Sequence, residues 1–139
     1  VVGAQPRFDP TGWAERLGLA RRLREQLRRA RAKGVAVRPI AMAELAEGCP
    51  LRMEADHLAR QWLDSRHMAA MGFLVTLELF VHPEQHRYYG AFGDGRLIAL
   101  LSLVPIPAQH GWLFEDLVRS SVAPNGTSEL LIDCAMRVL

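Results

Sequence analysis

The chain has 139 residues, half of them hydrophobic, which is enough for one domain with a single buried core. Its charged fraction of 23% is ordinary for a globular protein. No apolar run reaches the roughly 20 residues that a membrane helix needs, and no secretory signal is visible. The two cysteines, Cys49 and Cys134, match no metal-ligand spacing, so we expect a reduced cytoplasmic protein. The net charge of +2 conceals a basic first part, because residues 1–40 hold ten Arg or Lys against three Asp or Glu.

The first predicted element is a single basic helix over residues 12–33. Apolar residues recur there at spacings of three and four: Trp13, Leu17, Ala20, Leu23, Leu27 and Ala30. Four arginines recur in the same way on another side: Arg21, Arg24, Arg28 and Arg31. Gly34 is a natural stop signal for this helix.

The remaining elements predict an α+β fold, with an antiparallel sheet flanked by helices. In chain order they are a strand at 35–40, short helices near 41–47 and 52–67, a strand or irregular segment at 68–86, a hairpin at 87–107 with a Gly-Asp-Gly turn at 93–95, a strand at 111–120 and a helix at 126–138. The chain starts without methionine and stops within a predicted helix, so we expect a truncated domain. We divide it into a basic N-terminal helix, residues 1–34, and the first part of a larger domain, residues 35–139.

The junction between the last strand and the last helix is the strongest local motif. Pro124, Asn125 and Gly126 suit a type I turn, and Asn125 or Thr127 can cap the helix that follows. A helix start reached through a glycine is a ready anion site. The alternative is that the motif makes only a turn and a cap.

An acid and an arginine within the preceding apolar strand also need an explanation. Asp116 and Arg119 are costly to bury unless they are paired or face a cleft. A regular strand directs them to opposite faces, so they can share a face only if a bulge lies between them, with Glu115 left on the other side. An exposed edge with a surface salt bridge is the alternative.

Two further patterns leave more than one interpretation open. The arginine stripe of the first helix fits a phosphate backbone such as a tRNA acceptor arm, an anionic membrane surface, or an ordinary solvated helix face. His82 and His86 in "HPEQH" could bracket a metal with Glu84, but Pro83 disrupts a helical pair and no further ligands appear nearby. We therefore predict a polar loop there and no metal site.

The sequence also resembles a known family. "EDLVRSSVAPNGTSELLID", "LRRARAKGVAV" and "YYGAFGDGRLIALLSLVPIP" together resemble the catalytic domain of bacterial phosphatidylglycerol lysyltransferases, the multiple peptide resistance factors, and their soluble relatives. The family's members carry an acid-Leu-x-Arg strand, a loop with Asn-Gly and a helix with an early acidic residue. These correspond here to Asp116–Arg119, Asn125–Gly126 and Glu129. The resemblance spans about residues 21–139 and implies a GNAT-like acyltransferase fold.

The resemblance implies transfer of an aminoacyl group from tRNA to a lipid or small-molecule acceptor, with no cofactor. Asp116 would orient the attacking group or the aminoacyl ammonium, and Arg119 would hold a phosphate or the oxyanion. Asn125, Gly126 and Glu129 would bind substrate, with Glu78 a weaker candidate. The expected location is the cytoplasm, either free or at the inner face of the membrane. The alternatives are a non-catalytic module that binds nucleic acid or an anionic membrane, and an acetyl-coenzyme A dependent enzyme. The latter ranks lower because the usual pyrophosphate-binding Gly-x-Gly run is missing.

Overall fold

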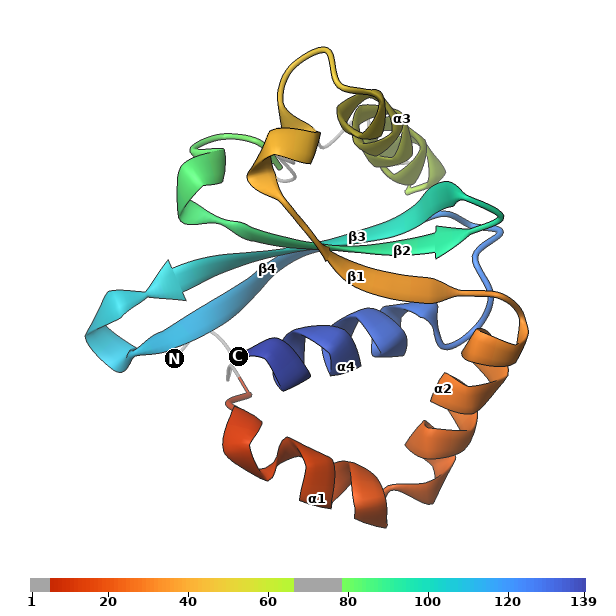
Figure 1. The fold of residues 1–139 in the computed structure, drawn as a ribbon, viewed down its shortest axis with the longest axis vertical. Coiled ribbons are helices and arrows are strands. Elements are labelled where there is room, and N and C mark those ends of the chain that lie inside the picture. The colour runs from red at the N-terminus through yellow and green to blue at the C-terminus, as the bar shows by residue number, and fades with distance from the viewer. Residues whose placement is uncertain (1–5, 67–78) are drawn as a thin grey trace.

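An antiparallel four-stranded sheet, in the order β1-β2-β3-β4, lies between two layers of helix in the computed structural model, which describes residues 6–66 and 79–139 (Figure 1). The predicted α+β class is confirmed. The strands are β1 (Ala36–Ile40), β2 (Arg87–Gly93), β3 (Arg96–Ile106) and β4 (Gly111–Arg119). The helices are α1 (Trp13–Leu19), α2 (Arg21–Ala32), α3 (Pro50–Ser65) and α4 (Thr127–Val138). Short 3-10 turns occupy Pro10–Gly12, Met42–Leu45, Pro83–Gln85 and Pro107–Gln109.

The predicted single helix over 12–33 is wrong in one respect, because the structure divides it into α1 and α2. Ala20 separates the two helices, with a ψ of 77° that no α-helix accommodates. The Ala20 carbonyl already accepts a hydrogen bond from Arg24 N–H, so the second helix begins at once. The apolar spacing persists across the break, which is why the pattern alone suggested one helix. The break lets α1 turn back beneath α4 (Figure 1).

The other predicted elements agree with the structure in type and approximate bounds, with two exceptions. The helix expected near 41–47 is only a 3-10 turn, and of the ambiguous segment 68–86 only residues 79–86 are described. The hairpin turn follows the prediction closely. Asp94 and Gly95 have φ values of 51° and 76°, the left-handed pair that a two-residue hairpin loop requires.

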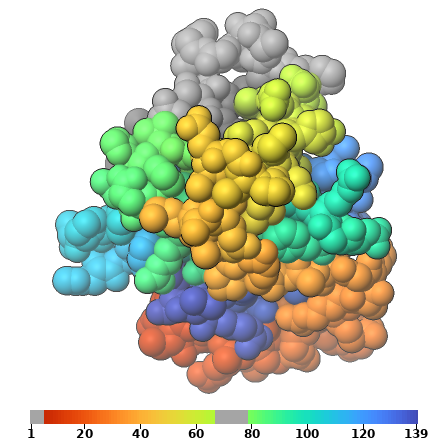
Figure 2. Space-filling model, turned by 45° about the horizontal axis from the view of Figure 1, so that its top comes forward, coloured from red at the N-terminus to blue at the C-terminus, as the bar shows by residue number. Residues whose placement is uncertain are grey.

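The two faces of the sheet carry separate hydrophobic cores. On one face α4 packs on the sheet, and α1 and α2 pack against α4. Leu27, Leu101 and Leu130 are almost fully buried between these helices and the sheet. On the other face α3 covers Leu100 and Val118. Figure 2 shows α3 and the segment that joins it to β1 on this side of the molecule. Burying each leucine stabilises the fold by roughly 1.5–3 kcal/mol, so both helical layers contribute.

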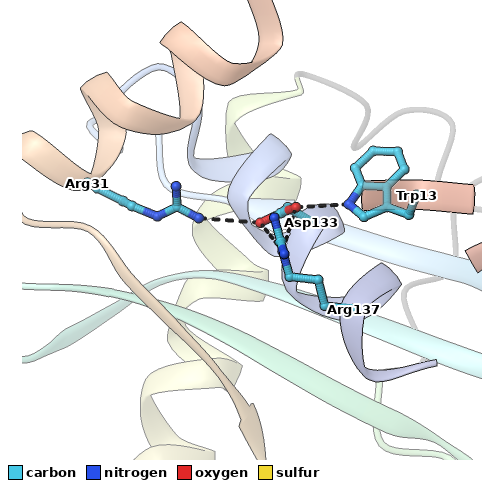
Figure 3. Close-up of polar contacts among 4 residues, drawn as sticks. All are labelled: Trp13, Arg31, Asp133 and Arg137. Atoms are coloured by element: carbon cyan, nitrogen blue, oxygen red, sulfur yellow. Dashed lines mark hydrogen bonds and ion pairs between the residues drawn. The ribbon is translucent and has the colours of Figure 1, made fainter. Parts of the chain in front are cut away.

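A buried carboxylate connects three helices on the α4 side. Asp133, only 2% exposed, accepts hydrogen bonds from Trp13 Nε1 at 2.9 Å and Arg137 Nε at 3.0 Å (Figure 3). Arg31 Nη2 lies 3.3 Å from its second oxygen. A buried charge is tolerated only when it is paired and hydrogen-bonded, and Asp133 meets that condition with donors from α1, α2 and α4 itself.

Loss of this carboxylate should destabilise the whole α4 side. We expect Asp133→Ala to lower the free energy of unfolding by about 2 kcal/mol or more, because hydrogen bonds to a charged group are lost. Trp13→Phe, which keeps the ring but removes one donor, should cost about 1 kcal/mol. Urea unfolding measures both values. Asp64→Ala, at an exposed position of α3, is the control. An Asp133→Ala protein as stable as this control would contradict the assignment.

Candidate functional site at the β4 bulge

The strand β4 contains a bulge, but not where the sequence required one. Ser102 pairs with Asp116 and Leu103 pairs with Phe114, so Glu115 is the extra residue. From Asp116 to Arg119 the register with β3 runs without interruption. Asp116 and Arg119 therefore point to opposite faces of the sheet. The condition for their acting together is not met, and the expected position of Glu115 on the face opposite Asp116 is also wrong.

The bulge instead brings two acids onto one face. Phe114 and Leu117 both pack into the core on the α4 side, although two residues rather than one separate them. Glu115 and Asp116, the two residues between, therefore both face the α3 side, and Val118 returns to that side's core. Arg119, two residues beyond Leu117, belongs to the α4 face.

A histidine and a buried serine adjoin these acids. His86 Nε2 lies 2.7 Å from a carboxylate oxygen of Glu115, and the His86 side chain is only 8% exposed. Ser102 is the cross-strand neighbour of Asp116 and is fully buried. Its hydroxyl has no hydrogen-bond partner among the described residues. A buried polar group without a partner is rare and requires an explanation.

Burial and charge shape the titration of this cluster. Burial and the neighbouring Glu115 charge raise the pKa of the Asp116 carboxyl, while the charge of His86 opposes the rise. Burial raises the pKa of Tyr88, which follows Ser102 in the cross-strand row, to about 12. Tyr88 therefore stays a neutral donor, and its hydroxyl donates to the Leu79 carbonyl at 2.6 Å. Within residues 6–66 and 79–139, no side chain hydrogen-bonds to Asp116.

The strand-to-helix junction is built for packing. Gly126 has a φ of 93°, and a Cβ there would lie 2.7 Å from the Gln26 carbonyl of α2. Thr127 Oγ1 donates to the Pro124 carbonyl at 2.6 Å, and no side chain caps α4, so the predicted cap by Asn125 or Thr127 is wrong. The glycine lets another helix, rather than a ligand, approach closely. The exposed Asn125 remains the outermost residue of the turn.

Glu129 also faces α2 in the first turn of α4. Its Oε1 accepts a hydrogen bond from Gln26 Nε2 at 3.2 Å. Its Oε2 is buried and has no hydrogen-bond partner among the described residues. Glu129 is thus remote from the Asp116 face, since α2 and α4 lie across the sheet from it. Glu78, the weaker candidate, lies outside the described residues.

The arginine stripe divides into structural and free members. Arg31 pairs with Asp133, and Arg24 Nη1 donates to the Leu17 carbonyl at 3.2 Å, which ties α2 to α1. Arg21 is paired with Glu25 at 3.6 Å, although its side chain is 84% exposed. Arg28 is exposed and has no ion-pair partner among the residues that the structure describes. Among these four, Arg28 is the member most available to an anionic partner.

An open pocket of about 470 Å³ on the α3 face was not predicted. It lies between α3, the start of β3 and the segment after β4, and its polar lining comes from Glu54, His57, Gln61, Arg96 and Ser120. Glu54 Oε2 accepts a hydrogen bond from Leu97 N–H at 2.8 Å and so ties α3 to the hairpin. Ser102, His86 and Glu115 were missed as well. Ser102 had a recognisable signal, since it is the lone polar residue in the apolar run 97–106.

Comparison with known proteins decides the family. Residues 19–139 match the family described as phosphatidylglycerol lysyltransferase, C-terminal. The chain belongs to this family. No curated protein matches the chain. A solved structure, the C-terminal domain (DUF2156) of an Agrobacterium fabrum protein named as a lysylphosphatidylglycerol synthetase, is similar with a TM-score of 0.64 and 17% identity.

The match to that structure covers 84% of this chain but only 36% of the other. At this identity it establishes a shared fold for the antiparallel sheet and its helices. In the described part of the chain, no helix has the length and apolar character to span a bilayer. The same residues contain no group of three or more potential metal ligands.

The packing role of Gly126 can be separated from its backbone role. Gly34 has a similar φ of 88°, but a Cβ there meets nothing within 4 Å. We expect Gly34→Ala to cost about 1 kcal/mol from the left-handed backbone alone. Gly126→Ala should cost at least about 1 kcal/mol more, because the new methyl overpacks against α2. Thermal unfolding of the two variants gives the difference, and equal losses would contradict close packing.

The raised pKa of Asp116 predicts a stability effect of definite sign. A carboxyl whose folded pKa lies above its unfolded value of 3.8 stabilises the fold only when protonated, so stability falls as pH rises through the folded pKa. Asp116→Asn should therefore be at least as stable as the parent at neutral pH, and this advantage should disappear near pH 3. Melting temperatures across this range test the sign, and a variant less stable at neutral pH would contradict it.

Proposed function

We propose that this chain is part of a GNAT-like aminoacyltransferase domain, which moves an aminoacyl group from tRNA to the hydroxyl of an anionic lipid such as phosphatidylglycerol. Membership of the lysyltransferase family supports the type of reaction. The single structural observation that carries the proposal is the bulge, which presents Asp116 as a half-buried carboxylate beside the buried Ser102, whose hydroxyl has no partner among the described residues.

The proposed step is an ester exchange. The acceptor hydroxyl oxygen forms a bond to the carbonyl carbon of the aminoacyl ester, and the bond from that carbon to the ribose oxygen breaks. The proton of the hydroxyl moves to the departing ribose oxygen, so no external oxidant, reductant or energy source is needed. A base positioned within hydrogen-bonding reach of the hydroxyl contributes typically 10²- to 10⁴-fold to such a step.

We assign the role of this base to Asp116. Its pKa is raised, chiefly by burial, and a base works best when its pKa approaches the working pH. Glu115 is engaged by His86, whereas no described side chain hydrogen-bonds to Asp116. We assign Arg119 only to a phosphate of the donor or acceptor, because its side chain belongs to the opposite face of β4. We assign Asn125, which is exposed in the turn before α4, to the same role.

The basic surface of α2 supplies the proposed contact with the tRNA backbone. Arg22, Arg28 and Arg29 are exposed on this helix, and arginines recognise phosphate oxygens through two parallel hydrogen bonds. Arg31 is excluded from this role because it already holds Asp133. A non-catalytic domain that only binds tRNA or an anionic membrane is the competing hypothesis, and the presence or absence of turnover separates the two.

The catalytic assignment predicts loss of activity without loss of fold. In the full-length protein, Asp116→Asn should reduce aminoacyl-lipid formation about 100-fold or more, because an amide cannot accept the proton. Lipid profiling of cells that express each variant measures the product. Asp64→Asn, on the exposed end of α3, is the matched control and should retain parental activity. Parental activity in Asp116→Asn would exclude Asp116 as the base. Absence of the product from the parental protein and from every variant would favour a binding module.

The assignment of α2 predicts a contrast between two of its arginines. Arg28→Gln should weaken tRNA binding and lower the slope of log K against log salt by about one, because one phosphate contact is removed. Arg31→Gln should mainly lower the melting temperature, because Asp133 loses a donor. Binding to tRNA at several salt concentrations is compared with binding to anionic vesicles. An Arg28→Gln protein that loses only vesicle binding would assign the surface to the membrane.

A further inference from the structure

The "HPEQH" segment serves a purpose that neither a metal site nor a plain polar loop explains. His82 has a φ of 52° and a ψ of 54°, a left-handed conformation that is unusual for a residue other than glycine. This conformation directs its carbonyl towards the turn that follows. The carbonyl accepts the Gln85 N–H at 3.0 Å and lies 2.9 Å from His86 Nδ1. Backbone strain of this kind costs roughly 1–3 kcal/mol and concentrates at functional sites.

Both ring nitrogens of His86 therefore face oxygen acceptors. Nδ1 faces the His82 carbonyl, and Nε2 lies 2.7 Å from a carboxylate oxygen of Glu115. A neutral imidazole has one N–H donor and can satisfy only one of these acceptors, whereas an imidazolium satisfies both. The ring also stacks on Tyr88, with centroids 5.8 Å apart and planes inclined by 20°, so its orientation is constrained from a third direction.

The surrounding charges favour the same protonation state. Burial lowers the pKa of His86, but its hydrogen bonds to the His82 carbonyl and to Glu115, together with the charges of Glu115 and Asp116, raise it above the ordinary value. Glu84 of the same turn adds a further carboxylate, which lies 3.5 Å from His82. On the α3 side, Arg52 stacks over Phe80, and its charge lowers the pKa of Tyr88 against the rise that burial causes.

We propose that His86 is a protonated positioning residue, which holds Glu115 at the bulge and leaves Asp116 as the free carboxylate that faces the substrate. This inference rests on the proposed function and extends it to a residue that does not touch the reacting atoms. Two adjacent carboxylates on one face repel each other, and a fixed cation that contacts Glu115 offsets that repulsion at Asp116. The left-handed backbone of His82 and the inserted residue Glu115 then act together. The first supplies a carbonyl and the second a carboxylate, and both face the His86 ring.

The test compares two substitutions with opposite electrostatic effects. His86→Gln removes a cation beside Asp116, so the acid limb of the kcat/KM profile should move to higher pH. Glu115→Gln removes an anion, so the same limb should move to lower pH. In the full-length protein, kcat of His86→Gln at neutral pH should also fall about tenfold or more, because Glu115 is no longer held. His110→Gln, at an exposed position between β3 and β4, should leave the profile unchanged.

A purely structural role for His86 cannot produce opposite shifts. Shifts in the same direction, or no shift in either variant, would overturn the proposal. Nitrogen-15 NMR of the histidine-labelled protein gives an independent measurement, with both His86 ring nitrogens expected to carry protons at pH 6.5. A neutral ring at that pH would overturn the proposal even if Asp116 proved catalytic. A protonated ring together with a fully active Asp116→Asn would refute the proposed function and leave the protonation of His86 intact.

Discussion

The inserted residue in β4 is the constraint on which the α3 face depends. Without it, Glu115 and Asp116 would alternate across the sheet, and one of them would enter the core beside Leu101 and Leu117. With it, both acids reach the same side, where His86 and Ser102 are already positioned by β2 and β3. A bulge changes the direction of side chains but disrupts hydrogen bonds between the paired strands. An outer strand tolerates this loss best, because water can replace the lost hydrogen bonds.

The opposite face of the sheet has a different purpose. There α4 is locked to α1 and α2 by Asp133 and by the close approach of the Gln26 carbonyl to Gly126. On this face α4 packs against β1, β2 and β3. The junction that looked like an anion site in the sequence therefore serves the scaffold. Its glycine is explained by helix packing, and its threonine by a bond within the turn.

Local patterns were enough to predict most of the fold, and the failures share a physical cause. The hairpin turn, β4 and α4 depend on turn chemistry and periodicity, which are encoded within a few residues. The break at Ala20 is decided by contacts between α1 and distant α4, so the apolar spacing carried no sign of it. The bulge is a property of the register between β3 and β4. The sequence indicated that Asp116 and Arg119 would need a bulge to share a face, but it did not indicate which residue of β4 is inserted. His86 was visible as part of a motif, yet its partner Glu115 is 29 residues away.

Two aspartates in one small domain show how environment divides structural from chemical roles. Asp133 is nearly inaccessible, yet three donors satisfy it, so its charge can be buried without leaving an unpaired acceptor. Asp116 is more exposed but lacks such donors within the described residues, and burial raises its pKa. Its cross-strand neighbour is the buried Ser102, whose hydroxyl has no partner among the residues that the structure describes. Unsatisfied and strained groups reduce stability, and natural proteins tolerate them mainly where function requires them. The raised pKa of Asp116, the bulge that directs it and the His86–Glu115 pair are the physical reason to seek the chemistry of this domain on the α3 face rather than at α4.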